Sequence, residues 1–218
     1  MEYSKNVMQA IKAFQEGKMV IIVDDYDREN EGDLVIPAEH ATPEVINFMT
    51  IYGRGLICIA VDQSYADRLG LDYMVTRNED DLGTAFTVSV DAAPSHGVTT
   101  GISAFDRART IQVMLDPASR SEDLRRPGHM FPLIAKPGGT FTRRGHTEAS
   151  TDLCVMAGLK KAAIIVEVLH PDGHMARIPY LTGFSKELNL PLVSVADIVQ
   201  ARRVLEQFSH EEVAVSTQ

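Results

Sequence analysis

The sequence lacks long apolar runs and an excess of basic residues. Its 218 residues contain no apolar segment near the ~20 residues that a membrane-spanning helix needs, and its first residues lack the apolar core of a signal peptide. With 21 basic against 30 acidic residues, the net charge of -9 argues against nonspecific binding to nucleic acid, which needs a basic surface. We therefore expect a cytoplasmic protein with neither nucleic-acid nor membrane partners.

Cysteine is also scarce, and several nucleotide and hydrolase motifs are missing. Cys58 and Cys154 are the only cysteines, and both lie in apolar stretches, which favours buried free thiols over a disulfide. Two such residues cannot build a cysteine-based zinc site. The Walker pattern, the dinucleotide glycine fingerprint, the EF-hand spacing and the nucleophile elbow are absent as well.

The composition is that of an ordinary globular protein, with 44% hydrophobic and 23% charged residues. This length suits one hydrophobic core, so residues 1–218 are predicted to form a single domain with a flexible tail at 209–218. Hydrophobic periodicity and turn residues predict helices at 5–16, 43–52, 103–115, 149–159, 180–188 and 196–208, and strands at 19–23, 34–37, 56–61, 86–90, 162–169, 175–178 and 192–195. Residues 73–83 and 125–130 are predicted loops, the second because it is rich in Pro and Gly. Interleaved helices and strands indicate an α+β fold, a layered α/β sandwich with a mixed sheet between helices.

The densest feature is the segment DDYDRENEGD at 24–33, with six carboxylates and one arginine directly after the apolar run 19–23. Carboxylates this close repel one another, which raises their pKa values unless a cation or a hydrogen-bond network keeps them ionised. A divalent metal would satisfy several of them, and hard oxygen ligands suit Mg²⁺ or Mn²⁺. The alternative is a solvated acidic loop.

A second segment, RRGHT at 143–147, lies at a predicted helix start, where free backbone N–H groups favour anions such as phosphate. Gly145 permits close approach of the backbone, Arg143 can fork onto phosphate oxygens and Thr147 adds a hydroxyl. His146 can complete a metal site with a carboxylate of the acidic loop. The alternative is an exposed basic cap with a surface histidine.

Two further polar residues leave two interpretations open. Glu167 lies in the apolar run 164–168 and either faces solvent by strand alternation or is buried and suited to proton transfer. His129 is either an ordinary loop histidine or a general base.

Four segments, taken in order, resemble the 3,4-dihydroxy-2-butanone 4-phosphate synthase family of riboflavin biosynthesis. They are DDYDRENEGDLVIPAE at 24–39, HGVTTGISAFDRARTI at 96–111, RRPGHMFPL at 125–133 and TRRGHTEASTDL at 142–153. The resemblance implies a similar fold and a magnesium-dependent lyase, with Mn²⁺ as a possible substitute, that converts D-ribulose 5-phosphate into formate and 3,4-dihydroxy-2-butanone 4-phosphate. The steps would be enolisation, dehydration, skeletal rearrangement and loss of formate.

The resemblance also implies an assembly. The family forms homodimers with active sites near the interface, where His129 would serve the neighbouring site. Many relatives continue into a GTP cyclohydrolase II domain, whereas this sequence stops at Gln218, so a monofunctional enzyme is expected.

The same resemblance assigns site residues. It implies Glu29 and His146 as metal ligands and His129, Glu167 and Asp33 as catalytic residues. The implied substrate-binding residues are Arg28, Glu29, Asp33, Arg143, Arg144, Gly145, His146, Thr147 and Glu167. Glu31, Thr99, Thr100 and Asp106 would adjoin the site without an assigned role, and Asp24, Asp25 and Asp27 would be structural. Arg144 departs from the family, in which many members have a small residue at this position.

Two other functions fit some of these residues. A metal-dependent sugar-phosphate isomerase or aldolase would use the same carboxylate, histidine and phosphate loop. The resemblance of the family's fold to an RNA- and nucleotide-binding fold suggests a phosphate- or nucleotide-binding module without catalysis, although the acidic composition opposes RNA binding.

Overall fold

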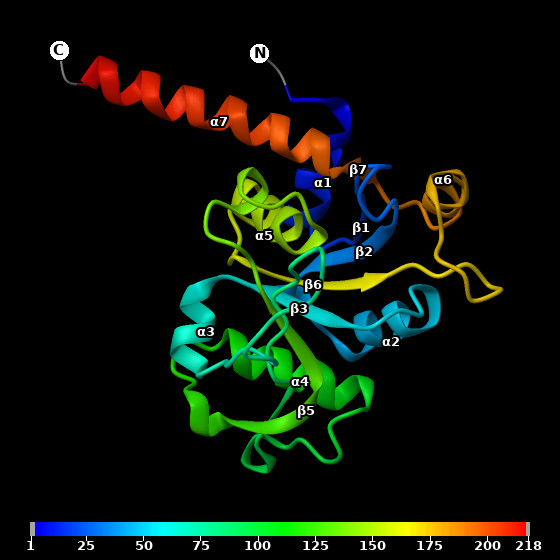
Figure 1. Cartoon of the computed structure of the whole chain (residues 1–218), viewed down its shortest axis with the longest axis vertical. Coiled ribbons are helices and arrows are strands. Elements are labelled where there is room, and N and C mark those ends of the chain that lie inside the picture. Colours follow the sequence, from blue (N-terminus) through cyan, green and yellow to red (C-terminus); the bar gives the residue numbers. More distant parts are fainter. Residues whose placement is uncertain (1–2, 217–218) are drawn as a thin grey trace.

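The computed structural model describes the backbone of residues 3–216 and the side chains of residues 3–206. A mixed seven-stranded sheet forms its centre, in the order β4-β5-β3-β6-β2-β1-β7. The strands are β1 Val20–Val23, β2 Gly32–Pro37, β3 Cys58–Val61, β4 Val90–Ala92, β5 Leu124–Ile134, β6 Ala162–Glu167 and β7 Leu192–Ser194. The prediction of an α+β fold with a mixed sheet between helices is confirmed (Figure 1).

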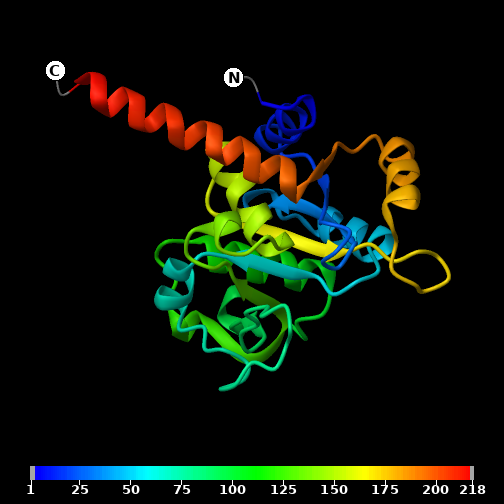
Figure 2. The same ribbon diagram turned by 45° about the horizontal axis from the view of Figure 1, so that its top comes forward.

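Helices cover both faces of this sheet. They are α1 Lys5–Gln15, α2 Pro43–Tyr52, α3 Gln63–Leu69, α4 Ala104–Leu115, α5 His146–Met156, α6 Ile178–Glu187 and α7 Val195–Ser216. Helices α1, α5 and α7 pack on one face and α2, α3 and α4 on the other, while α6 lies beside β1 and α7 extends away from the body (Figure 2). Across the described residues, no helix is long and apolar enough to cross a membrane.

Because both faces are covered, β1 and β3 are apolar throughout rather than alternating, and β2 and β6 are apolar apart from Asp33 and Glu167. All residues of β1 are buried, and neighbouring side chains enter opposite cores. Ile21 and Leu34 pack in the core beneath α2 and α4, whereas Ile22, Val35 and Cys58 pack in the core beneath α1, α5 and α7. The second core therefore lies on the face that α5 covers.

Local capping residues fix where two helices begin, as predicted. Thr42 Oγ1 accepts a hydrogen bond from Val45 N at 3.3 Å and opens α2, with Pro43 in its first turn. Ser103 Oγ accepts from Asp106 N at 3.0 Å and opens α4. These side chains satisfy N–H groups that a helix start leaves unpaired.

The prediction of a loop at residues 125–130 is wrong, because these residues belong to β5. Strand β4 pairs with β5 at Leu124, Arg125 and Met130, and the register shifts between Val90 and Asp91. This irregular stretch of the ladder tolerates Pro127, which has no N–H to donate. The backbone of Val90 and Asp91 approaches residue 128 so closely that only glycine fits there. Pro and Gly thus indicate a bulged strand here.

Other boundaries differ as well. Helix α3 was not predicted, although Asp62 caps its start and the left-handed Gly70 ends it. Residues Phe86 and Thr87 form only isolated bridges, and the expected return strand at 175–178 is a single bridge between Met175 and Leu169. Short segments such as these depend on tertiary pairing that local patterns do not encode.

Helices α5 and α7 are also longer or shifted relative to the predictions. Helix α5 begins at His146, three residues before the predicted start at 149. Helix α7 continues to Ser216, so most of the predicted tail at 209–218 has a helical backbone, and residues 217–218 lie outside the described residues. Whether that segment is flexible stays a prediction.

Candidate metal and substrate site

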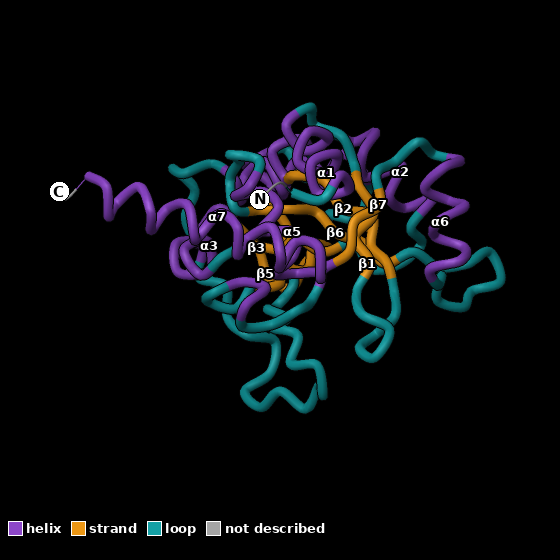
Figure 3. The backbone as a smooth tube through the Cα atoms, turned by 90° about the horizontal axis from the view of Figure 1, so that it is seen from above, coloured by secondary structure: helices purple, strands orange, loops and turns teal. Residues whose placement is uncertain are grey.

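The acidic loop between β1 and β2 projects from the sheet (Figure 3) and is organised around the buried carboxylate of Asp24. Asp24 Oδ1 accepts a hydrogen bond from Glu31 N at 2.9 Å, and Oδ2 accepts from Glu29 N at 3.1 Å and from Arg28 Nη1 at 2.8 Å. Both oxygens are therefore used within the loop. These contacts agree with the structural role predicted for Asp24.

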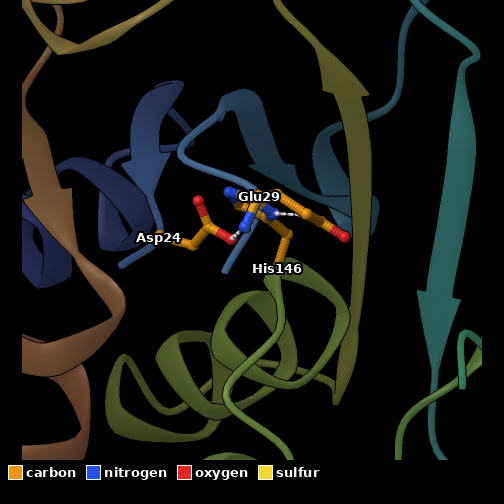
Figure 4. A group of neighbouring side chains, drawn as sticks. All are labelled: Asp24, Glu29 and His146. Atoms are coloured by element: carbon orange, nitrogen blue, oxygen red, sulfur yellow. Dashed lines mark hydrogen bonds and ion pairs between the residues drawn. The ribbon is translucent and has the colours of Figure 1, made fainter. Parts of the chain in front are cut away.

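Glu29 faces His146, the first residue of α5 (Figure 4). Glu29 Oε2 lies 3.4 Å from His146 Nδ1 and 2.8 Å from Arg28 Nη1. His146 is 6% exposed, and its Nε2 has no hydrogen-bond partner among the described residues. Potential ligand atoms of Asp24, Glu29 and His146 all lie within 4.8 Å of one another. Among the described residues, this is the only such group of three that could hold a metal ion. His146 thus has one ring nitrogen, Nδ1, facing a carboxylate and the other, Nε2, buried without a partner, an arrangement that a bound cation or a further polar group would complete.

Charge around His146 favours a cation at this position. Burial opposes the charged imidazole, but the carboxylates of Asp33, Glu29 and Asp24 outweigh it and raise the pKa of His146 to about 9. Burial likewise opposes the charged form of Glu29, whose pKa is nevertheless lowered by its hydrogen bond to His146 and by Arg28. Positive charge between these carboxylates is stabilised, whether a proton or a metal ion carries it.

The residues present fit a divalent cation. Mg²⁺ is usually bound by one or two carboxylates and completes its coordination with water and substrate oxygens. Glu29 supplies a carboxylate, which suits Mg²⁺ and Mn²⁺ alike, and His146 adds an imidazole, a ligand more typical of transition-metal ions. Asp24 is the poorer ligand of the three, because both its oxygens already accept hydrogen bonds.

Asp33 lies in β2, on the face of the sheet that α5 covers, and is 3% exposed. Burial raises its pKa to about 7, with repulsion from Glu167, Glu29 and Glu31 adding to the effect and His146 opposing it. Its Oδ1 has no hydrogen-bond partner within the described chain. A carboxyl group that titrates near neutral pH can both accept and return a proton.

Strand register brings Glu167 beside Asp33. Asp33 is the direct partner of Glu167 in the pairing of β2 with β6. Just before β3, Gly55 N donates to Glu167 O at 3.2 Å and Leu56 N donates to Glu167 Oε2 at 2.8 Å. His129 lies in β5, which is separated from β6 by β3. Glu167 is half-buried, so its side chain is neither fully exposed to solvent nor fully buried, the two alternatives that the sequence left open.

The start of α5 carries the predicted phosphate-binding residues. Gly145 occupies the N-cap position, which leaves the first N–H groups of α5 without a side-chain cap. Thr147 is 5% exposed, whereas the side chain of Arg144 is 53% exposed and lies 3.8 Å from Asp25. A helix start of this kind attracts anions.

The guanidinium of Arg143 is already hydrogen-bonded within the chain, whereas a residue that binds phosphate is expected to have free donors. Its Nε donates to Leu82 O at 2.9 Å, Nη1 to Glu148 Oε2 at 2.7 Å and Nη2 to Thr84 Oγ1 at 2.8 Å. Glu148 is 1% exposed and also accepts from Lys136 N at 3.0 Å. Arg143 therefore ties the loop at 82–84 to α5, and its contact with phosphate stays a prediction.

His129 forms a separate cluster with Asp91, a residue that the sequence interpretation missed. Asp91 Oδ2 lies 2.7 Å from His129 Nδ1, and Oδ1 accepts from His129 N at 2.9 Å. Because both oxygens hold one histidine, the imidazole is oriented with Nε2 directed away from the pair. No local motif marked Asp91, which reaches His129 only through the pairing of β4 with β5.

The residues expected beside the site have structural contacts. Asp106 accepts hydrogen bonds from Thr99 N, Thr99 Oγ1 and Gly101 N at 2.8 to 3.1 Å. It thereby shapes the turn before α4, while Thr100 is exposed. Asp106 is thus a loop-forming carboxylate in this structure.

Comparison with known proteins gives consistent matches. A family model described as 3,4-dihydroxy-2-butanone 4-phosphate synthase matches residues 8–201. The riboflavin biosynthesis protein RibBA of Aquifex aeolicus is 53% identical over 196 residues, which cover 90% of this chain and 48% of that protein. RibBA of Synechocystis is 51% identical over 203 residues, covering 93% of this chain and 36% of that protein. The chain spans about half, or less, of these curated relatives.

Solved structures agree in fold. A 3,4-dihydroxy-2-butanone 4-phosphate synthase in complex with two magnesium ions is 38% identical, with a TM-score of 0.86, covering 94% of this chain and 99% of that chain. RibBX of A. baumannii, a two-domain synthase, is 43% identical with a TM-score of 0.86, covering 90% of this chain and 57% of that chain.

Proposed function

The chain belongs to the 3,4-dihydroxy-2-butanone 4-phosphate synthase family, and on that basis we propose that it is a lyase of riboflavin biosynthesis. It would convert D-ribulose 5-phosphate into formate and 3,4-dihydroxy-2-butanone 4-phosphate. The observation that carries the proposal is the buried pair of Glu29 and His146, whose Nε2 has no partner among the described residues. This pair lies at the start of a helix suited to phosphate, so a sugar phosphate can meet both features at once.

Glu29 and His146 would hold the divalent cation. A related structure that contains two magnesium ions favours Mg²⁺, and Mn²⁺ is a substitute because both ions prefer carboxylate ligands. When bound, such an ion would polarise oxygens of the sugar and stabilise negative charge on them. The remaining contributions come from the side chains of the chain itself.

Asp33 is the best-placed group for proton transfer near neutral pH, since its pKa of about 7 allows both protonation states. Glu167 lies beside it in register and would take part in the same exchange of protons. Arg28, which contacts Asp24 and Glu29, would orient sugar hydroxyl groups at the edge of the loop. Burial of Asp33 and His146 keeps water from these groups.

The phosphate would lie at the start of α5, against the N–H groups that follow Gly145 and the hydroxyl of Thr147. Arg143 and Arg144 would add positive charge nearby. Arg143 can reach phosphate only by exchanging one of its present hydrogen bonds. Its first role would thus be to orient the start of α5.

We also propose a homodimer whose active sites lie near the interface, with His129 acting on the neighbouring site. Exposed apolar side chains on and near α2 and α4 support an interface there; they are Ile51, Tyr52, Leu56, Ile102 and Phe105. Mixing His129→Ala with His146→Ala variants tests this, because a shared site restores activity in half of the sites of a mixed dimer. No recovery above the separate variants would count against it.

The proposed reaction is tested by incubating the chain with D-ribulose 5-phosphate and Mg²⁺ and measuring formate. We expect formate release that stops when EDTA removes the metal. Ketose-aldose interconversion or aldol cleavage without formate would instead indicate the isomerase or aldolase. Unchanged substrate under both conditions would exclude all three activities.

The assay uses this chain alone, since we propose that the activity does not require a GTP cyclohydrolase II domain. The cytoplasmic location stays a prediction from composition.

A further inference from the structure

Arg177, the residue that precedes α6, holds the outer side of the β1–β2 loop. Its Nη1 donates hydrogen bonds to the carbonyl oxygens of Glu29 and Asn30, both at 2.6 Å. The same nitrogen lies 3.8 Å from Glu31 Oε1. The contact with Glu29 joins residues 148 positions apart in the sequence.

Together with Asp24, this arginine fixes the backbone of Glu29 from two sides. Asp24 accepts from the N–H groups of Glu29 and Glu31, whereas Arg177 donates to the C=O groups of Glu29 and Asn30. Asn30 has a φ of 55°, a left-handed conformation that asparagine adopts more readily than most residues. This turn brings two successive carbonyls to one nitrogen of Arg177.

Arg177 is itself held by rigid elements. Its carbonyl accepts from Leu181 N at 2.9 Å in the first turn of α6, and the preceding Ala176 N donates to Val168 O at 3.0 Å. Ala176 and Leu181 are 1% and 0% exposed, and Leu181 packs against Gly32 at the end of the acidic loop. The guanidinium therefore reaches the loop from a backbone that is anchored in the core.

We propose that Arg177 is a positioning residue that holds Glu29 in place opposite His146, an inference that rests on the proposed metal site. The ion pair with Glu31 is a weaker explanation, because at 3.8 Å and with 47% of the Arg177 side chain exposed it contributes little. The two hydrogen bonds to carbonyls are short and charge-assisted. They act on the backbone of Glu29, the loop carboxylate that is paired with His146.

The test measures Mn²⁺ affinity by calorimetry for the wild type and for Arg177→Met, Arg177→Lys and Arg68→Met. Arg68 is a matched control, since it donates to the carbonyls of Met114, Asp116 and Ser119 far from the acidic loop. We expect Arg177→Met to weaken Mn²⁺ binding roughly 10- to 100-fold, as for groups that orient metal ligands. Arg177→Lys should recover part of the affinity, and Arg68→Met should leave it unchanged even if it lowers the melting temperature.

Amide hydrogen exchange at Glu29 and Glu31 without metal provides a second measurement. Both amides should exchange faster in Arg177→Met and at the wild-type rate in Arg68→Met. Wild-type Mn²⁺ affinity in Arg177→Met would overturn the proposal while leaving the proposed function intact. If the wild type neither binds Mn²⁺ nor releases formate, the proposed function fails, and the exchange rates alone decide whether Arg177 holds this loop.

Discussion

Two histidines of this chain each face a carboxylate, and the two pairs differ in what they leave unsatisfied. His129 and Asp91 are 2.7 Å apart, both oxygens of Asp91 hold that histidine, and 42% of the His129 side chain is exposed. His146 and Glu29 are 3.4 Å apart, His146 is buried, and its Nε2 has no partner among the residues described. In the first pair both carboxylate oxygens are hydrogen-bonded within the pair, whereas in the second a buried ring nitrogen still needs a partner from a further group.

This difference separates two chemical roles. A short histidine–carboxylate pair with one free ring nitrogen orients an imidazole for proton transfer. A longer pair surrounded by further carboxylates attracts a cation. Buried atoms without partners are rare in folded proteins, so they are a better guide to the binding site than the number of acidic residues nearby.

The largest expected effect comes from removing the incomplete pair. His146→Ala or Glu29→Gln should lower formate release on the order of a thousandfold, because a metal ion contributes several kcal/mol of transition-state stabilisation. Calorimetry should show the loss of Mn²⁺ binding while circular dichroism stays unchanged. The control is His170→Ala, at a half-buried histidine that pairs with Asp172. Full activity in either site variant would contradict the assignment.

The second effect separates the two pairs. His129→Ala should lower formate release roughly a hundredfold, the contribution of a general base, without changing Mn²⁺ affinity. The matched control is His96→Ala, since His96 also pairs with a carboxylate, that of Asp123 at 2.8 Å. If His129→Ala weakened Mn²⁺ binding as strongly as His146→Ala, both histidines would be metal ligands and the proposed difference between the two pairs would be wrong.

A smaller effect should follow when the partner of His129 is changed. Asp91→Asn keeps the shape but not the charge and should lower kcat about 10-fold, with little change in KM, because it acts through the orientation of His129. Asp123→Asn disrupts the comparable surface pair and should leave kcat unchanged. Equal losses in both variants would indicate a general effect on folding.

The smallest effect is on the pH dependence of stability in EDTA. The folded state raises the pKa of Asp33 from 3.8 to about 7 and that of His146 from 6.5 to about 9. The folded state therefore binds more protons than the unfolded state between these values, and the free energy of unfolding falls as the pH rises from about 4 to about 9. Asp33→Asn should reduce the drop in melting temperature between pH 5 and pH 7.5 by roughly 5 °C. Asp172→Asn is the control, because the pKa of Asp172 is about 2 and it stays ionised throughout. An unchanged slope in Asp33→Asn would argue against a raised pKa for Asp33.

The sequence by itself determined features that depend on near neighbours. Thr42 and Ser103 cap their helices from three residues away, and the acidic loop closes on Asp24 within seven residues. The fold class also followed from these patterns, while the choice of Glu29, His146 and Asp33 as site residues came from the family resemblance and stays a prediction. Local hydrogen bonds and hydrophobic periodicity encode such features directly.

Only the tertiary structure decided which of these groups meet. Sheet register paired Asp33 with Glu167, a bulged β5 brought His129 to Asp91, and Arg177 reached Glu29 across 148 residues. The same packing engaged Arg143 with Glu148 and the loop at 82–84. Such contacts arise from the register of distant strands and from helices packed on them, which no local pattern specifies.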